Sequence, residues 1–217
     1  ITFKWYFLND FLLFVNLIDN KIKCFFMMSQ KFFKIFNNLD LKVYKSGIKK
    51  NKTDLLLITL PKQSSIAGLF TKSVTASAAV KFCRNNLQFK NNKVRAILIN
   101  SGNANAFTGK KGINCVESLL SFLSKYLNCS NKEVFTASTG VIGEFLDANL
   151  IINQIKNENF TSHNSWIEAA KAIMTTDTFY KIAHKTCFIK NEKINLIGIA
   201  KGSGMIAPNM ATMLAFI

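Results

Sequence analysis

Two nearly continuous apolar runs constrain the fold of this chain more than any other feature. The first run covers residues 54–60 and is closed by Pro61, and the second covers residues 94–100. Apolar runs of this length without polar alternation are typical of strands that are buried on both faces. The two runs therefore predict neighbouring parts of a core that is covered from two sides.

Helical and strand patterns alternate along the rest of the chain. Between Gly112 and Leu127 the apolar residues recur at helical spacing, which predicts a helix. Two further helices and three further strands are predicted, the helices over residues 147–155 and 165–175 and the strands over residues 133–138, 193–200 and 213–217. Internal repeats and low-complexity linkers are absent from the sequence, so we expect one compact α/β unit.

The net charge of +16 comes almost entirely from lysine. Only Arg84 and Arg95 among the 28 basic residues are arginines, and the lysines are scattered along the sequence. Arginine is the residue that binds phosphates and base edges through two parallel hydrogen bonds, so its scarcity argues against a dedicated nucleic-acid surface. We interpret the charge as solvated surface and expect no specific nucleic-acid partner.

The cysteines and histidines indicate neither disulfides nor a metal site. The five cysteines are odd in number and form no CxxC pair, and the two histidines are not spaced as metal ligands. These residues are Cys24, Cys83, Cys115, Cys129, Cys187, His163 and His184. We therefore expect reduced thiols in a cytoplasmic protein, no metal and no Ser-His-Asp chemistry.

The N-terminal segment, residues 1–26, differs in pattern from the rest of the chain. Residues 5–18 are strongly apolar but are interrupted by Asn9, Asp10 and Asn16. This stretch is shorter than a helix that crosses a bilayer needs to be. We predict an extension of undefined role outside the working domain and no membrane association, with a membrane anchor as the alternative.

Three polar segments stand where a purely structural chain would have little use for them. Residues 100–109 combine asparagines with small residues, which suits either a tight connection or a close approach to a ligand. Residues 138–143 contain Thr139 and Gly140, whose hydroxyl and amide could stabilise the oxyanion of an acyl transfer. Residues 174–178 could cap the next element or line a polar pocket.

A glycine-containing segment, residues 201–211, leads to Thr212 at the start of the apolar tail. If the bond between Ala211 and Thr212 breaks, Thr212 gains a free amine that can activate its own hydroxyl as a nucleophile. This layout is typical of self-cleaving threonine enzymes. The alternative is a loop before a buried strand, in which Thr212 is only a residue that favours β structure.

Taken together and in this order, these segments resemble the ornithine acetyltransferase family, also called glutamate N-acetyltransferase, of arginine biosynthesis. The resemblance covers residues 47–217, and its matching stretches are residues 67–71, 100–109, 138–144, 169–179 and 199–216. It implies an N-terminal-nucleophile-like fold, a mixed-sheet sandwich with flanking helices. Residues 27–211 would then be the α chain and residues 212–217 the start of a β chain whose remainder is missing.

The resemblance also implies a reaction and a site. The chain would cleave itself between Ala211 and Thr212, and Thr212 would then carry an acetyl group from N-acetylornithine to glutamate. The other implied residues are Thr139 and Gly140, which stabilise the oxyanion, and Thr175 and Lys201, which contact the substrate. From sequence alone, an exposed surface lysine is an equally good interpretation of Lys201.

The family's reaction implies no cofactor, although acetyl-CoA is a candidate co-substrate. The implied partner is the chain's own β chain, in an α2β2 heterotetramer, and this chain alone is expected to be inactive. Two other function classes stay open on sequence grounds. One is a self-processing amidohydrolase or aminopeptidase in which water accepts the acyl group, and the other is a basic binding protein without chemistry.

Overall fold

The computed structural model describes residues 39–87, 92–202 and 213–217. The chain divides into two units, residues 1–37 and 38–217, and every described residue belongs to the second unit. The predicted extension over residues 1–26 therefore lies outside the described residues. The same holds for Ala211 and Thr212, the predicted cleavage positions.

Five strands form the first sheet, in the order β4-β3-β2-β1-β5. They are β1 (Asp40–Tyr44), β2 (Leu55–Thr59), β3 (Ala96–Asn103), β4 (Val134–Val141) and β5 (Phe160–His163). β3 and β4 run parallel, whereas the other neighbours run antiparallel. The two apolar runs form the adjacent strands β2 and β3, and the mixed sheet confirms the predicted α/β class.

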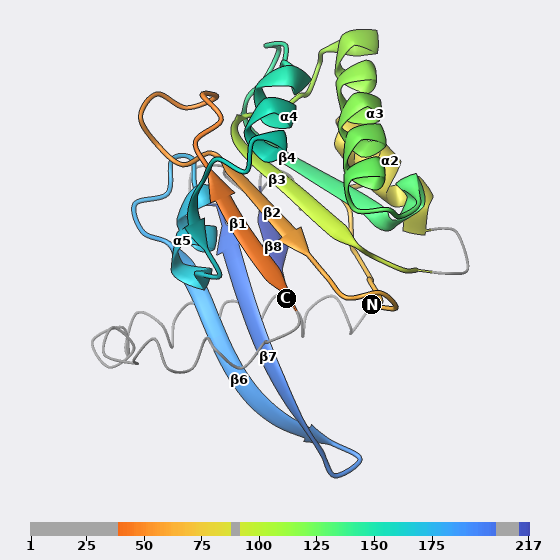
Figure 1. Cartoon of the computed structure of the whole chain (residues 1–217), viewed down its shortest axis with the longest axis vertical. Helices are drawn as coiled ribbons and strands as arrows, with labels where there is room; N and C mark the ends of the chain where they lie inside the picture. Colours follow the sequence, from red (N-terminus) through yellow and green to blue (C-terminus); the bar gives the residue numbers. More distant parts are fainter. Residues whose placement is uncertain (1–38, 88–91, 203–212) are drawn as a thin grey trace. The chain divides into compact units, whose positions relative to one another are not determined.

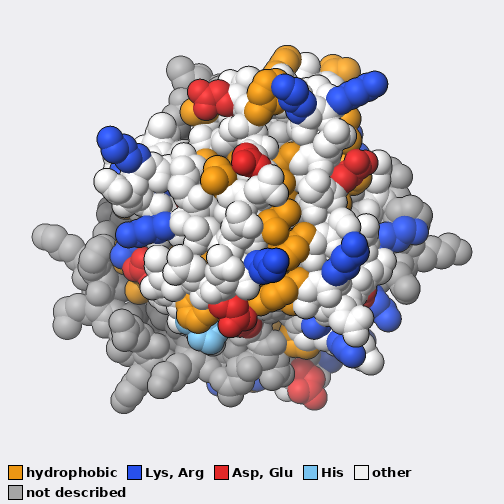
Figure 2. All heavy atoms as spheres, turned by 45° about the horizontal axis from the view of Figure 1, so that its top comes forward, with side chains coloured by type: hydrophobic (Ala, Val, Ile, Leu, Met, Phe, Trp, Pro, Cys, Tyr) orange, Lys and Arg blue, Asp and Glu red, His pale blue; other side chains and the backbone are white. Residues whose placement is uncertain are grey.

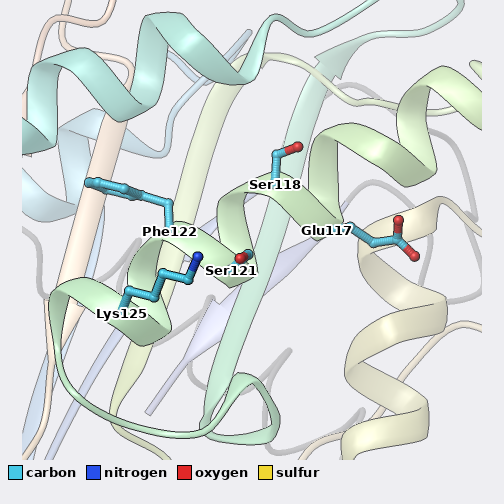
Figure 3. Close-up of a pocket in the computed structure, with 5 residues that line it drawn as sticks. All are labelled: Glu117, Ser118, Ser121, Phe122 and Lys125. Atoms are coloured by element: carbon cyan, nitrogen blue, oxygen red, sulfur yellow. The ribbon is translucent and has the colours of Figure 1, made fainter.

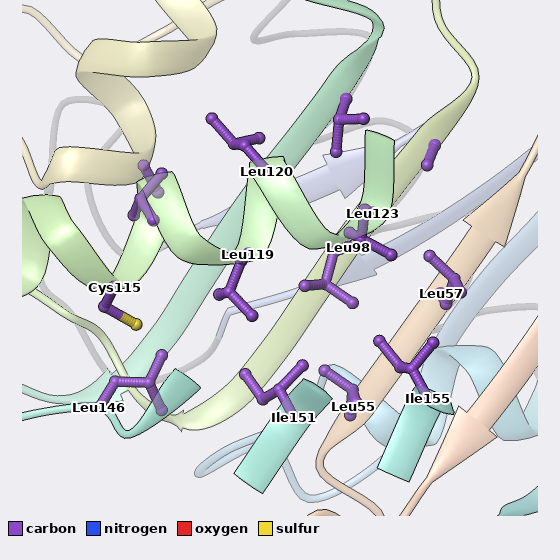
Figure 4. Close-up of a cluster of buried hydrophobic side chains, with 14 of the residues drawn as sticks. Leu55, Leu57, Leu98, Cys115, Leu119, Leu120, Leu123, Leu146, Ile151 and Ile155 are labelled. Carbon is purple, nitrogen blue, oxygen red and sulfur yellow. The ribbon is translucent and has the colours of Figure 1, made fainter. Parts of the chain in front are cut away.

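Three helices cover one face of this sheet (Figure 1): α2 (Ala78–Leu87), α3 (Gly109–Tyr126) and α4 (Ala148–Lys156). Side chains from the sheet and from α3 and α4 meet in one apolar cluster, shown in Figure 4, that includes Leu57, Leu98, Leu123 and Ile151. On the opposite face of β2, Leu56 and Ile58 are also buried. The prediction that these strands are covered on both faces is therefore confirmed.

A second, antiparallel sheet has the order β6-β7-β8, from β6 (Lys181–Ile189), β7 (Glu192–Lys201) and β8 (Leu214–Phe216). The sequence predicted β7 and β8 but not β6. The short helix α5 (Trp166–Ala172) contacts β1 and β2 of the first sheet and β6 and β7 of the second. The helix α5 thus joins the two sheets.

The sequence predicted the C-terminal end of α5 three residues too far along the chain, at Thr175 rather than at Ala172. The backbone N–H of Thr175 donates to the side chain of Asp177 at 3.2 Å instead of continuing the helical ladder. Short polar side chains compete for backbone groups in this way and favour turns over helix. The polar segment 174–178 is therefore a turn between α5 and β6.

The face of the molecule shown in Figure 2 agrees with the interpretation of the charge as solvated. On the face shown in Figure 2, lysine and arginine side chains are spread among acidic and uncharged ones and form no single basic patch. Within the described ranges, no helix has both the length and the apolar character needed to cross a membrane.

Candidate active site

The site lies at the carboxyl ends of the two parallel strands β3 and β4. In their register, Ser101 is opposite Thr139 and Gly102 is opposite Gly140. Gly140 has a φ of +134°, and a β carbon there would lie 2.2 Å from the carbonyl carbon of Gly102. Only glycine allows so close an approach, and it is this approach that sets the end of β4, with Thr139, against β3.

The asparagines that follow β3 are used within the protein. Asn100 accepts a hydrogen bond from the Ser138 hydroxyl at 2.6 Å, and Asn103 accepts one from the backbone N–H of Asn105 at 2.7 Å. Asn105 donates to the carbonyl of Gly112 at 3.1 Å and has a positive φ of 45°. Of the two interpretations of residues 100–109, the structure favours the tight connection, because their amides already hold the loop in place.

Lys201 brings three of the predicted site residues together. This lysine ends β7 and is only 2% exposed, so its interpretation as a surface lysine is wrong. Its ammonium donates to the hydroxyl of Thr139 at 3.0 Å and to the hydroxyl of Thr175 at 2.7 Å. Residues from β4, from the turn after α5 and from β7 therefore meet at one buried point.

Asp177 organises this point, although the sequence indicated it only as a member of the polar segment 174–178. Its Oδ1 accepts hydrogen bonds from Lys181 Nζ and from the backbone N–H of Gly202, both at 2.8 Å. Its Oδ2 accepts the N–H of Thr175, and its side chain has no exposed surface. The carboxylate thus ties the turn after α5 to the end of β7.

Burial and charge act against each other in this cluster. Burial lowers the pKa of Lys201 below its ordinary value, Asp177 opposes this effect, and the like charge of Lys181 adds to it. Burial alone would raise the pKa of Asp177, but hydrogen bonds from Lys181, Gly202 and Thr175 outweigh it and hold that pKa below its usual value. The ionised carboxylate of Asp177 therefore favours the charged form of Lys201, which burial disfavours.

A second lysine reaches the same turn from the loop between β1 and β2. Lys49 Nζ donates to the carbonyl of Met174 at 3.1 Å, and burial lowers its pKa while Asp54 opposes that shift. Asp54 is fully buried and accepts the backbone N–H groups of Ser46 at 2.6 Å and Lys49 at 2.9 Å. Sequence reasoning missed this pair, because lysines in a short polar loop resemble solvated surface; the one available signal was an aspartate at the start of a buried strand.

The described residues on either side of positions 203–212 lie next to each other. Leu214 of β8 pairs with Lys201 of β7, and a β carbon on Gly202 would lie 3.6 Å from the Cα of Met213. Met213, the residue after Thr212 in sequence, is therefore beside the end of β7. The assignments of Ala211 and Thr212 stay predictions.

Other candidate sites in the described part of the chain are weaker. A shallow depression on the outer face of α3 (Figure 3) is lined by Glu117, Ser118, Ser121, Phe122 and Lys125. All of these side chains come from one helix, and none belongs to the cluster around Lys201. Among the described residues no group of three or more His, Cys, Asp or Glu side chains is placed to hold a metal ion.

Two sheets joined by a helix, with helices on the outer face and a polar cluster at the strand ends, define an N-terminal-nucleophile-like fold. The particular family follows from comparison with known proteins. The ArgJ family matches residues 40–217, and the chain belongs to this family.

Similar curated proteins are the arginine biosynthesis bifunctional proteins ArgJ of Bartonella henselae and Rhizobium meliloti. They are 48% and 49% identical to this chain over 174 residues, which is 79% of this chain and 42% of each relative. The chain thus spans less than half the length of these relatives.

Two crystal structures share the fold at 30% sequence identity. The ArgJ bifunctional protein of Bacillus halodurans has a TM-score of 0.72, with 80% of this chain and 91% of that chain covered. The ornithine acetyltransferase of Mycobacterium tuberculosis, crystallised with ornithine, has a TM-score of 0.66, with coverage of 80% and 93%.

Proposed function

We propose that this chain carries the acetyl-transfer site of a glutamate N-acetyltransferase, the ornithine acetyltransferase of arginine biosynthesis. The observation that carries the proposal is the buried ammonium of Lys201, which contacts both Thr139 and Thr175. A lysine ammonium between two hydroxyls is a suitable binding group for an amino-acid substrate, because it can form an ion pair with the substrate carboxylate. Membership of the ArgJ family and the relative crystallised with ornithine support the same substrate class.

In the proposed mechanism the chain first cleaves itself between Ala211 and Thr212. The freed amine of Thr212 takes the proton of its own hydroxyl, and the hydroxyl oxygen attacks the acetyl carbonyl of N-acetylornithine. The Thr139 hydroxyl and the Gly140 N–H stabilise the negative oxygen that forms. Support for placing the nucleophile here comes from Met213, which lies beside Gly202.

Two steps then complete the transfer, formation of an acetyl ester on Thr212 and passage of the acetyl group to glutamate. The C–N bond of the substrate breaks, ornithine leaves with the proton, and an acetyl ester remains on Thr212. The amine of glutamate next attacks this ester, the C–O bond breaks, and the threonine oxygen regains a proton. Thr175 and Lys201 would hold the amino-acid part of each substrate in turn, so ping-pong kinetics are expected.

This reaction needs no cofactor when acetylornithine is the donor, and acetyl-CoA is the proposed second donor because the curated relatives are named bifunctional. The proposed partner is the chain's own β chain, in an α2β2 heterotetramer. We place the enzyme in the cytoplasm, where free thiols stay reduced.

Intact-mass measurement of the complete gene product tests the cleavage. A new N-terminus at Thr212 is expected, and Thr212→Ala should leave the product in one piece. An uncut wild-type protein would remove the basis for a threonine nucleophile.

A turnover assay with acetylornithine, with and without glutamate, tests the transfer. Acetylglutamate should form only with glutamate present, whereas acetate release without it would indicate a hydrolase. Thr139→Val should lower kcat by about 10²–10³-fold, the usual cost of losing one oxyanion donor. Thr136→Val is the matched control, because Thr136 lies on the same strand, is buried, and its hydroxyl has no hydrogen-bond partner among the described residues.

A further inference from the structure

We propose that Asp177 is a positioning residue that acts on the Thr139 hydroxyl through Lys201. The inference rests on the proposed function, in which the Thr139 hydroxyl donates to the oxyanion. It assigns a task to a buried carboxylate whose described partners are Lys181, Gly202 and Thr175 rather than Thr139 itself.

The geometry gives Asp177 control over where the ammonium of Lys201 sits. Its carboxylate holds the backbone N–H of Gly202, the residue after Lys201, at 2.8 Å. The same carboxylate holds the backbone N–H of Thr175 at 3.2 Å, and the Thr175 hydroxyl is 2.7 Å from Lys201 Nζ. One buried side chain therefore fixes both the backbone that carries the ammonium and the hydroxyl that accepts from it.

The charge of Lys201 decides the direction of its hydrogen bond to Thr139. An ammonium group has three donors and no lone pair, so at 3.0 Å from Thr139 Oγ1 it can only donate. The proton of the Thr139 hydroxyl is then free to point at another acceptor, such as a developing oxyanion. A neutral amine has a lone pair and can accept this proton, which would turn the hydroxyl away from the substrate.

The surroundings of Lys201 contain influences that disfavour its charged form and one group that favours it. Burial lowers the pKa of Lys201, and the like charge of Lys181 acts in the same direction. Lys201 in turn lowers the pKa of the neighbouring Lys49. Among the described groups that act on Lys201, Asp177 is the one that favours its charged form. Without the Asp177 charge, Lys201 should lose its proton at a lower pH than in the wild type. The Thr139 hydroxyl should then lose its donor orientation towards the oxyanion at that lower pH.

The first measurement follows the Lys201 side chain directly, by NMR titration of protein with ¹³C-labelled lysine, with the Lys201→Arg spectrum as the assignment. Asp177→Asn keeps the shape of the side chain but removes its charge, so the Lys201 midpoint should fall. Lys181→Met removes a like charge, so the midpoint should rise. A merely structural role for Asp177 does not predict shifts of opposite sign.

The second measurement is the pH profile of kcat/KM for acetyl transfer in the same variants. The alkaline limb should move down in pH for Asp177→Asn and up for Lys181→Met, and the activity of Asp177→Asn should recover as the pH is lowered. Glu168→Gln is the matched control, because it breaks the exposed pair with Lys171 on α5 and should leave both readouts unchanged.

The outcomes separate this inference from the proposed function. A wild-type enzyme without acetyl transfer refutes the function, while the titrations of Lys201 still decide the role of Asp177. The inference is overturned if Asp177→Asn leaves the Lys201 midpoint in place, or if both variants move it in one direction. If Asp177→Asn does not fold, Asp177→Ser, which also removes the charge, takes its place: a lowered Lys201 midpoint supports the inference and an unchanged midpoint refutes it.

Discussion

Replacement of Gly140 by alanine tests whether the ends of the neighbouring strands β3 and β4 require glycine for their close approach at the site. The added β carbon would lie 2.2 Å from the carbonyl carbon of Gly102, 2.5 Å from its oxygen and 2.6 Å from the backbone nitrogen of Asn103. Carbon atoms in contact normally stay about 3.5–4.0 Å apart. Because the neighbours are backbone atoms, they cannot rotate away, and one of the two strands must shift.

The expected loss of stability has two parts. Overpacking of this kind costs about 1–3 kcal/mol. The φ of +134° adds a strain of about 1–3 kcal/mol for any residue with a β carbon. The sum, about 2–6 kcal/mol, is a large share of the roughly 5–15 kcal/mol that stabilises a typical domain.

Urea unfolding followed by circular dichroism measures this loss. With a slope of about 2 kcal/mol per molar, the midpoint should fall by about 1–3 M for Gly140→Ala. Gly143→Ala is the control for strain alone, because Gly143 has a φ of +87° but nothing within 4 Å of an added β carbon. Gly198→Ala controls for alanine in a strand, since its nearest neighbour would be 3.5 Å away. If Gly140→Ala is no less stable than Gly143→Ala, the close approach of the two strands does not require glycine at position 140.

Three further expectations concern stability and reactivity. Leu123→Ala should lower the free energy of unfolding by about 2–5 kcal/mol because Leu123 is fully buried, whereas Leu150→Ala, at a position 43% exposed, should cost much less in the same urea titration. Burial raises the pKa of the Cys83 thiol to about 11, so this thiol should stay unreactive towards a thiol reagent at pH 8 until urea unfolds the protein, and fast labelling in the native state would contradict the burial. The pKa of Asp177 is lower in the folded state than in the unfolded state, so its ionised form stabilises the fold above the unfolded pKa, and this contribution is lost as the pH falls through the folded pKa. The urea midpoint should therefore fall less steeply towards acidic pH for Asp177→Asn than for wild type. Parallel curves of midpoint against pH would contradict this.

Most of the fold could be predicted where the signal is local. The apolar runs of β2 and β3 and the helical spacing of α3 are set by neighbours within a few residues, so the sequence alone indicated these elements. The strand β6 was missed because its alternation is weak and only some of its residues are half-buried. The end of α5 was misplaced because the competing hydrogen bond to Asp177 was not visible in the pattern.

The candidate site divides in the same way. The sequence by itself indicated the polar segments that we propose to carry the chemistry, because a Thr-Gly pair at a strand end, a run of hydroxyls and a threonine after a glycine-containing loop are each local features. Only the tertiary structure decided that Lys201 is buried and that it contacts Thr139 and Thr175, which lie 62 and 26 positions away. It also decided that Asp177 joins their elements. Burial and charge depend on which distant residues pack together, and no local pattern contains that information.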